Sequence, residues 1–354
     1  MENVETKGKI EFMQHPHEDS LTTSILHPIL KKWFFEKFKT YSEPQRYSIY
    51  NIHCRMNTLV SAPTGSGKTL SAFGAVLNEL IDHSEKGTLQ DRVYCVYVSP
   101  LRALSNDIHK NLVEPLEEME KLAEKKFGIR VGIRTGDTTS YEKSKMLKIP
   151  PHILITTPES LAIMLASTKF VEHLRHVEWV IVDEVHAIAD NKRGVHLSLA
   201  LEALSHISPH NTRIGLSATV APLEEVAKYL VGTQRDCKIV DVQFLKKLDL
   251  QVLCPVPDLI GTAHEVMHAE MYRVIDELVQ QHKTTLIFTN TRSATERVVD
   301  HLKHKFPKNY TDNIGAHHGS LGKELRQNLE RRLREGKLKC VVCSTSLELG
   351  IDIG

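Results

Sequence analysis

Short apolar runs alternate with longer amphipathic stretches along the chain up to residue 242. The apolar runs predict β-strands at 58–62, 93–99, 153–156, 179–182, 213–217 and 238–242. A helix is predicted at 70–81 because its apolar residues recur at spacings of three and four, and a second, aromatic-rich helix at 29–38. Strands that alternate with helices in this way indicate an α/β fold with βαβ units around a parallel sheet.

The same alternation starts again near residue 246. Here the pattern predicts strands at 248–256, 285–289, 314–316 and 339–343, with helices at 263–282, 293–305 and 322–335 between them. We therefore expect one α/β domain over residues 21–245 and a second, incomplete one over residues 246–354. Residues 1–20 are polar, and we expect them to form a flexible leader.

Composition places the chain among ordinary soluble proteins, with 41% apolar and 25% charged residues in a length of 354. The net charge is +1, so any nucleic-acid site must come from a local arrangement of cationic groups. The N-terminus lacks the apolar core of a signal peptide, and no run approaches the ~20 residues of a membrane span. We expect a cytoplasmic protein without a membrane partner.

Two pairs of residues that are close in sequence invite a metal interpretation. Cys340 and Cys343 form a Cys-x-x-Cys, but two valines separate them, and no second pair follows at zinc spacing. A buried strand accounts better for this pair, because free cysteine packs as a small apolar residue. His317 and His318 lack an evident third ligand, which favours another role for them.

A glycine-rich segment stands between the predicted strand at 58–62 and the helix at 70–81. Glycines in such a loop let backbone N–H groups approach phosphate oxygens, and the helix N-terminus adds its positive dipole end. The lysine can reach the β- and γ-phosphates, and the final threonine can ligate Mg²⁺. We expect this phosphate-binding loop to hold ATP through Ala62, Pro63, Thr64, Gly65, Ser66, Gly67, Lys68 and Thr69.

A carboxylate pair follows the apolar strand predicted at 179–182. Asp183 and Glu184 then lie at the carboxyl end of a parallel strand, where α/β sheets bind their ligands. ATP hydrolysis needs an acid that holds Mg²⁺ and a group that orients or deprotonates water. We assign the first role to Asp183 and the second to Glu184, with Lys68 as the cationic catalytic residue. We expect His186 to couple this site to the neighbouring domain by hydrogen bonding.

Further short motifs follow in a fixed order. They are Ser42-Glu-Pro-Gln45, Ser99-Pro-Leu-Arg102, Thr135-Gly-Asp137-Thr138, Thr156-Thr157-Pro158-Glu159-Ser160, Lys192-Arg193-Gly194, Ser217-Ala218-Thr219, Asn290-Thr291-Arg292, His317-His318-Gly319 and the segment from Ser344 to Asp352. Each motif alone is a weak signal. Together, behind a phosphate-binding loop, they resemble the motifs of superfamily-two DExH-box helicases, and most closely those of the large helicase-related (Lhr) group.

The resemblance implies two RecA-like domains and a role for each motif. Gln45 would read the adenine of ATP, Gly350 and Asp352 would contribute to the ATP site, and Ser217 and Thr219 would couple hydrolysis to strand movement. The nucleic-acid residues implied in the same way are Arg102, Thr157, Pro158, Asn290, Thr291, Arg292, His318 and Thr345. The resemblance favours single-stranded DNA or a DNA–RNA hybrid, although RNA stays open, and we expect a monomer.

The residue types in these motifs agree with that interpretation. Hydroxyls, backbone N–H groups and guanidinium groups at strand ends suit phosphate oxygens and sugars better than base edges. We therefore expect a single strand to be held along its backbone with little sequence preference.

The chain ends soon after Gly350-Ile-Asp352, before the arginine motif that the resemblance leads one to expect. We expect this chain to bind ATP and Mg²⁺ but to hydrolyse ATP poorly, because such an arginine is worth about 10³–10⁵ in rate in other P-loop enzymes. Two alternatives stay open at this point. One is a non-catalytic module that binds ATP and nucleic acid, and the other is a P-loop kinase of small molecules.

Overall fold

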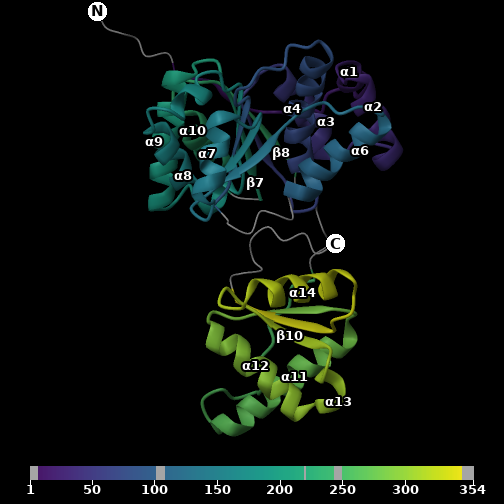
Figure 1. Ribbon diagram of the computed structural model, residues 1–354. Coiled ribbons are helices and arrows are strands. Elements are labelled where there is room, and N and C mark those ends of the chain that lie inside the picture. The colour runs from purple at the N-terminus through teal and green to yellow at the C-terminus, as the bar shows by residue number, and fades with distance from the viewer. Residues whose placement is uncertain (1–6, 101–107, 219–220, 243–248, 345–354) are drawn as a thin grey trace, which may run out of the picture. The chain divides into compact units, whose positions relative to one another are not determined.

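The computed structural model of the chain describes residues 7–100, 108–218, 221–242 and 249–344. The chain divides into two compact units, Met1–Phe244 and Leu245–Gly354 (Figure 1). Each unit has its own parallel sheet and its own apolar cores, as expected of α/β domains.

The first unit contains a parallel sheet whose strands lie in the order β1-β8-β2-β7-β6-β3-β5-β4. Every pair of neighbours in this sheet runs parallel, so all the carboxyl ends meet at one edge. The strands are β1 (Ile10–Phe12), β2 (Thr58–Ser61), β3 (Cys95–Val98), β4 (Val131–Arg134), β5 (Ile153–Thr156), β6 (Trp179–Val182), β7 (Thr212–Ser217) and β8 (Cys237–Asp241).

Helices cover both faces of this sheet, as the two groups in Figure 1 show. Successive side chains of each strand point to opposite faces of the sheet. Val60 and Ile181 pack on one face, and Leu59 and Val180 pack on the other. One layer contains α2 (Pro28–Phe38), α3 (Glu43–His53), α4 (Lys68–Glu85) and α6 (Glu114–Leu122), with α1 (Asp19–Ser24) beside α3. The other contains α7 (Ser140–Lys148), α8 (Pro158–Leu165), α9 (Lys192–Ile207) and α10 (Leu223–Val231).

The expected flexible leader is wrong for its described part. Residues 10–12 form β1, which pairs in parallel with β8 at the edge of the sheet. His17 hydrogen-bonds Asn51 through Nε2 at 2.8 Å, and α1 begins at Asp19. A three-residue strand is too short to give a periodic signal, so the pattern of polar residues concealed it.

The second unit contains a parallel sheet in the order β10-β11-β9. Its strands are β9 (Thr285–Phe288), β10 (Ile314–His317) and β11 (Cys340–Cys343). One face packs against α11 (His264–Gln281), α12 (Arg292–Lys305) and α13 (Pro307–Tyr310), and the other against α14 (Lys323–Arg334). These elements agree with the strands and helices expected after residue 263.

The strand expected at 248–256 does not form within its described part, residues 249–256. Leu250 is 89% exposed and Val252 is 97% exposed, so the alternation of apolar residues meets no packing surface here. A strand needs a neighbouring strand that pairs with its backbone N–H and C=O groups. An alternating pattern of apolar residues does not provide this neighbour.

The Cys-x-x-Cys segment is a buried strand, as expected. Cys340 and Cys343 belong to β11, and burial raises the pKa of the Cys340 thiol to about 12. Among the described residues, no cluster of His, Cys, Asp or Glu could hold a metal ion. Within the described ranges, no helix combines the length and apolarity that crossing a membrane requires.

A charged cluster lies at the amino-terminal edge of the first sheet, away from the loops that carry the motifs. Arg55 donates to both Glu79, at 2.6 Å, and Glu178, at 2.5 Å, and its guanidinium lies 3.7 Å from the centre of the Trp179 ring. Burial raises the pKa of Glu79 to about 7, and the neighbouring Glu178 adds to this although Arg55 opposes it.

This cluster makes the stability of the first unit depend on pH. Because folding raises the pKa of Glu79, the native state binds more protons than the unfolded chain between pH about 4.5 and about 7. Stability is therefore lost as pH rises through that window. We expect Glu79→Gln to be more stable than the wild type by about 1–2 kcal/mol at pH ~8 but not at pH ~5. Urea unfolding at both pH values tests this, and parallel curves for the two proteins would contradict it.

Candidate nucleotide and nucleic-acid sites

The phosphate-binding loop connects β2 to α4, as expected. Gly65 has φ +77° and Gly67, the residue before the helix, has φ +88°. Side chains other than glycine rarely adopt this left-handed backbone. The loop therefore leads directly into the N-terminus of α4, where free N–H groups and the helix dipole attract an anion.

Gln45 lies directly against this loop. Its side chain is 4% exposed and accepts a hydrogen bond from the Ser42 backbone N–H at 2.8 Å. A Cβ added to Gly67 would lie 2.9 Å from Gln45 Nε2 and 3.0 Å from Ser42 Oγ. The segment expected to read adenine is thus packed against the phosphate-binding loop with no room for a larger residue at 67.

Lys68 begins α4 and is 5% exposed. Its Nζ donates to the Ala62 carbonyl at 3.1 Å, within the loop itself. Ala62 in turn donates its N–H to the Ser217 carbonyl at 3.1 Å, which fixes the loop to β7. Thr69 follows in the first turn of α4 and is half-buried.

Asp183 lies buried at the carboxyl end of β6. Tyr97 of β3 donates its hydroxyl to Asp183 Oδ2, and the Glu184 N–H donates to Oδ1 at 2.9 Å. Burial raises the pKa of Asp183, while Tyr97 and the charge of Lys68 oppose the rise. A buried carboxylate is an oxygen donor that suits Mg²⁺, whose charge would stabilise the ionised form.

His186 links the carboxylate pair to β7. Its Nε2 lies 3.2 Å from Glu184 Oε2, while its Nδ1 accepts from the Ala218 N–H at 3.1 Å and lies 3.2 Å from Ser217 Oγ. Burial lowers the pKa of His186, and Lys68 lowers it further. A neutral ring with Nδ1 as acceptor carries its proton on Nε2, which then donates to Glu184. Thr219, the next residue of this expected coupling segment, lies outside the described residues.

The expected nucleic-acid residues of the first unit follow β5, in the other half of the sheet. Thr157 is 5% exposed and caps α8 by accepting from the Ser160 N–H, and Pro158 is the first residue of that helix. Thr156 donates to the Arg134 carbonyl at 2.7 Å, which joins the ends of β5 and β4. Arg102 lies outside the described residues.

Arg193 belongs to the Lys192-Arg193-Gly194 motif, for which the sequence indicates no role. Its Nε donates to Glu159 Oε1 at 2.6 Å, and a terminal nitrogen donates to the Pro100 carbonyl at 3.1 Å. Arg193, the second residue of α9, thus connects the segment after β3 to the segment after β5. Its only sequence signal was its place shortly after Asp183-Glu-Val-His186.

In the second unit, the expected residues gather at the carboxyl ends of β9 and β10, which flank β11. Thr291 caps α12 by accepting from the Ala294 N–H at 3.1 Å, and Asn290 is exposed beside it. Arg292 donates to Ser320 Oγ at 2.5 Å, across the end of the sheet. Thr345, Gly350 and Asp352 lie outside the described residues.

The two adjacent histidines each bind a carboxylate. His318 Nε2 lies 2.7 Å from Glu296 Oε1, and His317 Nε2 lies 3.3 Å from Glu330 Oε1. These contacts fix the segment after β10 to α12 and α14.

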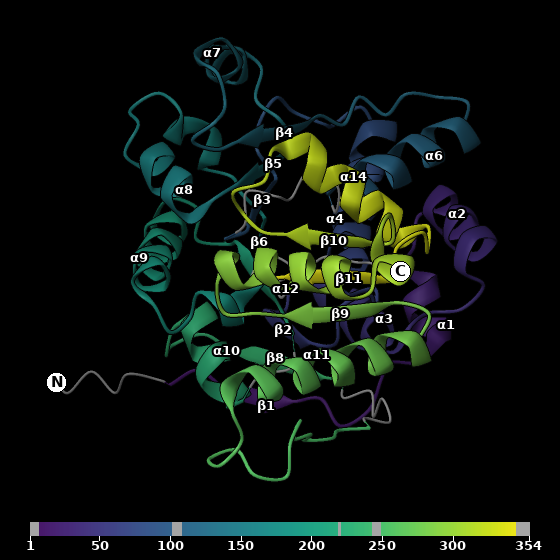
Figure 2. The same ribbon diagram turned by 90° about the horizontal axis from the view of Figure 1, so that it is seen from below.

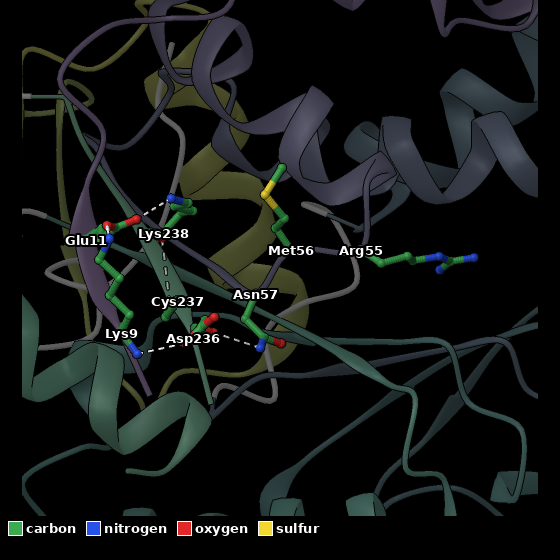
Figure 3. Close-up of a pocket in the computed structure, with 8 residues that line it drawn as sticks. All are labelled: Lys9, Glu11, Arg55, Met56, Asn57, Asp236, Cys237 and Lys238. Carbon is green, nitrogen blue, oxygen red and sulfur yellow. Dashed lines mark hydrogen bonds and ion pairs between the residues drawn. The ribbon is translucent and has the colours of Figure 1, made fainter. Parts of the chain in front are cut away.

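A pocket of about 250 Å³ lies at the amino-terminal ends of the strands of the first sheet, near the starts of β1, β2 and β8 (Figure 3). Its charged groups satisfy one another: Glu11 pairs with both Lys9 and Lys238, and the Lys9 N–H donates to Asp236 Oδ1 at 2.7 Å. Arg55 extends away from this group in the figure. The pocket thus reflects how β1 is attached and brings together none of the motif residues.

A phosphate-binding loop, a carboxylate pair at the end of a neighbouring strand and a second parallel α/β unit define a P-loop protein with two RecA-like units. A family model described as DEAD/DEAH box helicase matches residues 42–227, and one described as helicase conserved C-terminal domain matches residues 269–354. The chain belongs to the DEAD/DEAH box helicase family, and its core is Lhr-like.

Relatives and solved structures support the same placement. The chain is 56% identical over 339 residues to the ATP-dependent helicase Lhr-Core of Methanothermobacter thermautotrophicus, covering 94% of this chain and 39% of that protein. It is 52% identical to Lhr-Core of Methanocaldococcus jannaschii, covering 98% and 41%. The helicase Lhr of Mycobacterium smegmatis, solved with ssDNA and AMP-PNP, has a TM-score of 0.80 at 40% identity, with 94% and 43% covered. The chain thus spans about two fifths of these relatives.

The crowding at Gly67 gives a test of the loop. We expect Gly67→Ala to weaken ATP binding by about tenfold or more, because a Cβ meets Gln45 and Ser42 in a backbone that disfavours any side chain. Gly74→Ala in the same helix is the matched control, since nothing lies within 4 Å of its added Cβ and alanine favours a helix. Titration with a fluorescent ATP analogue measures both. Equal affinities in the two variants would contradict the proposed packing.

Proposed function

We propose that this chain is the motor core of an ATP-dependent helicase that moves along a single strand of nucleic acid. The observation that carries the proposal is the hydrogen-bond chain from Glu184 through His186 to Ser217 and Ala218, next to Lys68. A site that only bound nucleotide would need the phosphate-binding loop alone. A chain that joins the hydrolytic carboxylate to another loop suits an enzyme that converts hydrolysis into movement.

The nucleotide would be held by the loop of residues 62–69, with Gln45 against the adenine and Lys68 at the β- and γ-phosphates. Mg²⁺, held by Thr69 and Asp183, would neutralise phosphate charge. Glu184 would orient the attacking water and accept its proton, since His186 supports its ionised form with a hydrogen bond. Lys68 would neutralise the charge that develops on the transferred phosphate.

The strand would be gripped by the loops after β3, β5 and β4 of the first unit and by those after β9 and β10 of the second. These segments offer hydroxyls, helix N-termini and a guanidinium, which suit a phosphate backbone. The relative solved with ssDNA supports DNA as the substrate. The residues themselves favour neither DNA nor RNA.

ATP turnover measured with and without single-stranded DNA tests this function. We expect DNA to raise the turnover of the wild type. Lys68→Ala removes the phosphate contact and abolishes both ATP binding and turnover. Glu184→Gln keeps ATP binding but lowers turnover by about 10²-fold or more, because a general base contributes that much. Lys86→Ala, at the residue that caps the C-terminus of α4, is the control for the loss of a lysine away from the site.

The outcomes separate the competing functions. Turnover that ignores nucleic acid would favour a small-molecule kinase. ATP and DNA binding without any turnover in the wild type would favour a non-catalytic binding module. Full unwinding activity in Lys68→Ala would show that the phosphate-binding loop has been assigned wrongly.

A further inference from the structure

One face of α7 combines an exposed aromatic ring with two lysines. Tyr141, Lys145 and Lys148 stand at positions i, i+4 and i+7, so they lie on the same side of the helix. The Tyr141 side chain is 78% exposed, and both lysines are exposed as well. We call these three residues the α7 face.

The opposite side of α7 anchors the helix to the first unit. Met146 and Leu147 are partly buried against the core that includes α8 and α9. The end of the Met146 side chain approaches Gly132 of β4, where an added Cβ would lie 3.4 Å from it. His173 Nε2 also lies 3.0 Å from the Leu147 carbonyl. The α7 face is therefore held outward by packing on its other side.

The charge of this face is not neutralised within the helix. The acidic residue of the first turn, Glu142, is bound to Thr139 through both the backbone N–H and the hydroxyl, in a capping box. Neither Lys145 nor Lys148 has an ion pair in the part of the chain that the structure describes. Two positive charges and an aromatic ring are left facing solvent.

The position of α7 relates this face to the nucleic-acid loops. The helix follows Thr135-Gly-Asp-Thr138 at the end of β4, which is the last strand on that side of the sheet. Tyr141 lies in the first turn of α7, which directly follows the loop at the carboxyl end of β4. Figure 2 shows α7 beyond β4, at the outer end of the first unit.

We propose that the α7 face binds single-stranded nucleic acid beyond the helicase motifs, with Tyr141 stacking on a base and Lys145 and Lys148 contacting phosphates. Aromatic rings interleaved with cations are how proteins hold single strands without reading sequence. The proposal rests on the proposed function, because it extends the path of a strand gripped by the first unit. It predicts a longer binding site than the motifs alone would form.

Exposed lysines on a helix usually serve only solubility. A tyrosine that is 78% exposed is different, because it forgoes the burial that favours an aromatic side chain. Tyr141 is aligned with two lysines on one face of the helix, next to loops that suit phosphates. A single ligand can therefore contact the ring and both lysines. A polyanion with unstacked bases meets the charge and the ring together, which an acidic peptide does not.

Binding of labelled oligo(dT) of about 10 and about 30 nucleotides, followed by fluorescence anisotropy over a range of salt concentrations, tests the proposal. Tyr141→Ala should weaken binding of the longer strand by about fivefold or more without changing the salt dependence, and Tyr141→Phe should restore it. The paired change Lys145→Glu with Lys148→Glu should weaken it and lower the slope of log K against log salt by about 1.4. The shorter strand should respond less.

The matched control is Lys31→Glu with Lys32→Glu on α2. These lysines are also exposed, the change in net charge is identical, and α2 lies away from α7 (Figure 2). Equal weakening in both paired variants would mean that only net charge matters and would overturn the inference. So would wild-type affinity and slope in all α7 variants. A wild-type chain that binds neither strand would instead overturn the proposed function itself.

Discussion

The parallel direction of every strand in the first sheet brings all the carboxyl ends to one edge, and the functional loops depend on that constraint. The strand order then divides this edge in two. The loops after β2, β7 and β6 carry the residues expected to bind phosphate and to hydrolyse ATP, while those after β3, β5 and β4 carry the expected nucleic-acid segments. The halves meet between β6 and β3, where Tyr97 binds Asp183.

Maintaining this junction has a cost in stability. Burial raises the pKa of Asp183, so its ionised form is poorly stabilised by the protein alone. Glu184 adopts the left-handed backbone at φ +51°, which costs a residue with a side chain about 1–2 kcal/mol. Strain and buried charge of this kind are common where a site must respond to a ligand. Arg193 provides a second connection, because it donates hydrogen bonds to Glu159 and to the Pro100 carbonyl.

Sequence reasoning located the features that depend on local pattern. The strands that precede the phosphate-binding loop and Asp183-Glu184 are continuous apolar runs, so they and their loops were predicted correctly. It missed β1 and β4, because three or four residues at the side of a sheet carry little periodic signal. It predicted a strand at 248–256 from alternation alone, although strand formation needs a partner. Arg193 and the His186 contacts join residues far apart in sequence, which only the folded chain brings together.

We propose that the state of the nucleotide controls the affinity for the nucleic-acid strand through His186. The most direct measurement is the dissociation constant for single-stranded DNA with no nucleotide, with ADP and with a non-hydrolysable ATP analogue, in the wild type and in His186→Ala. We expect the wild-type affinity to change with the nucleotide by about fivefold or more, which corresponds to a coupling free energy of about 1 kcal/mol or above. The variant should lose most of this change. A wild-type affinity that is the same in all three states would contradict it.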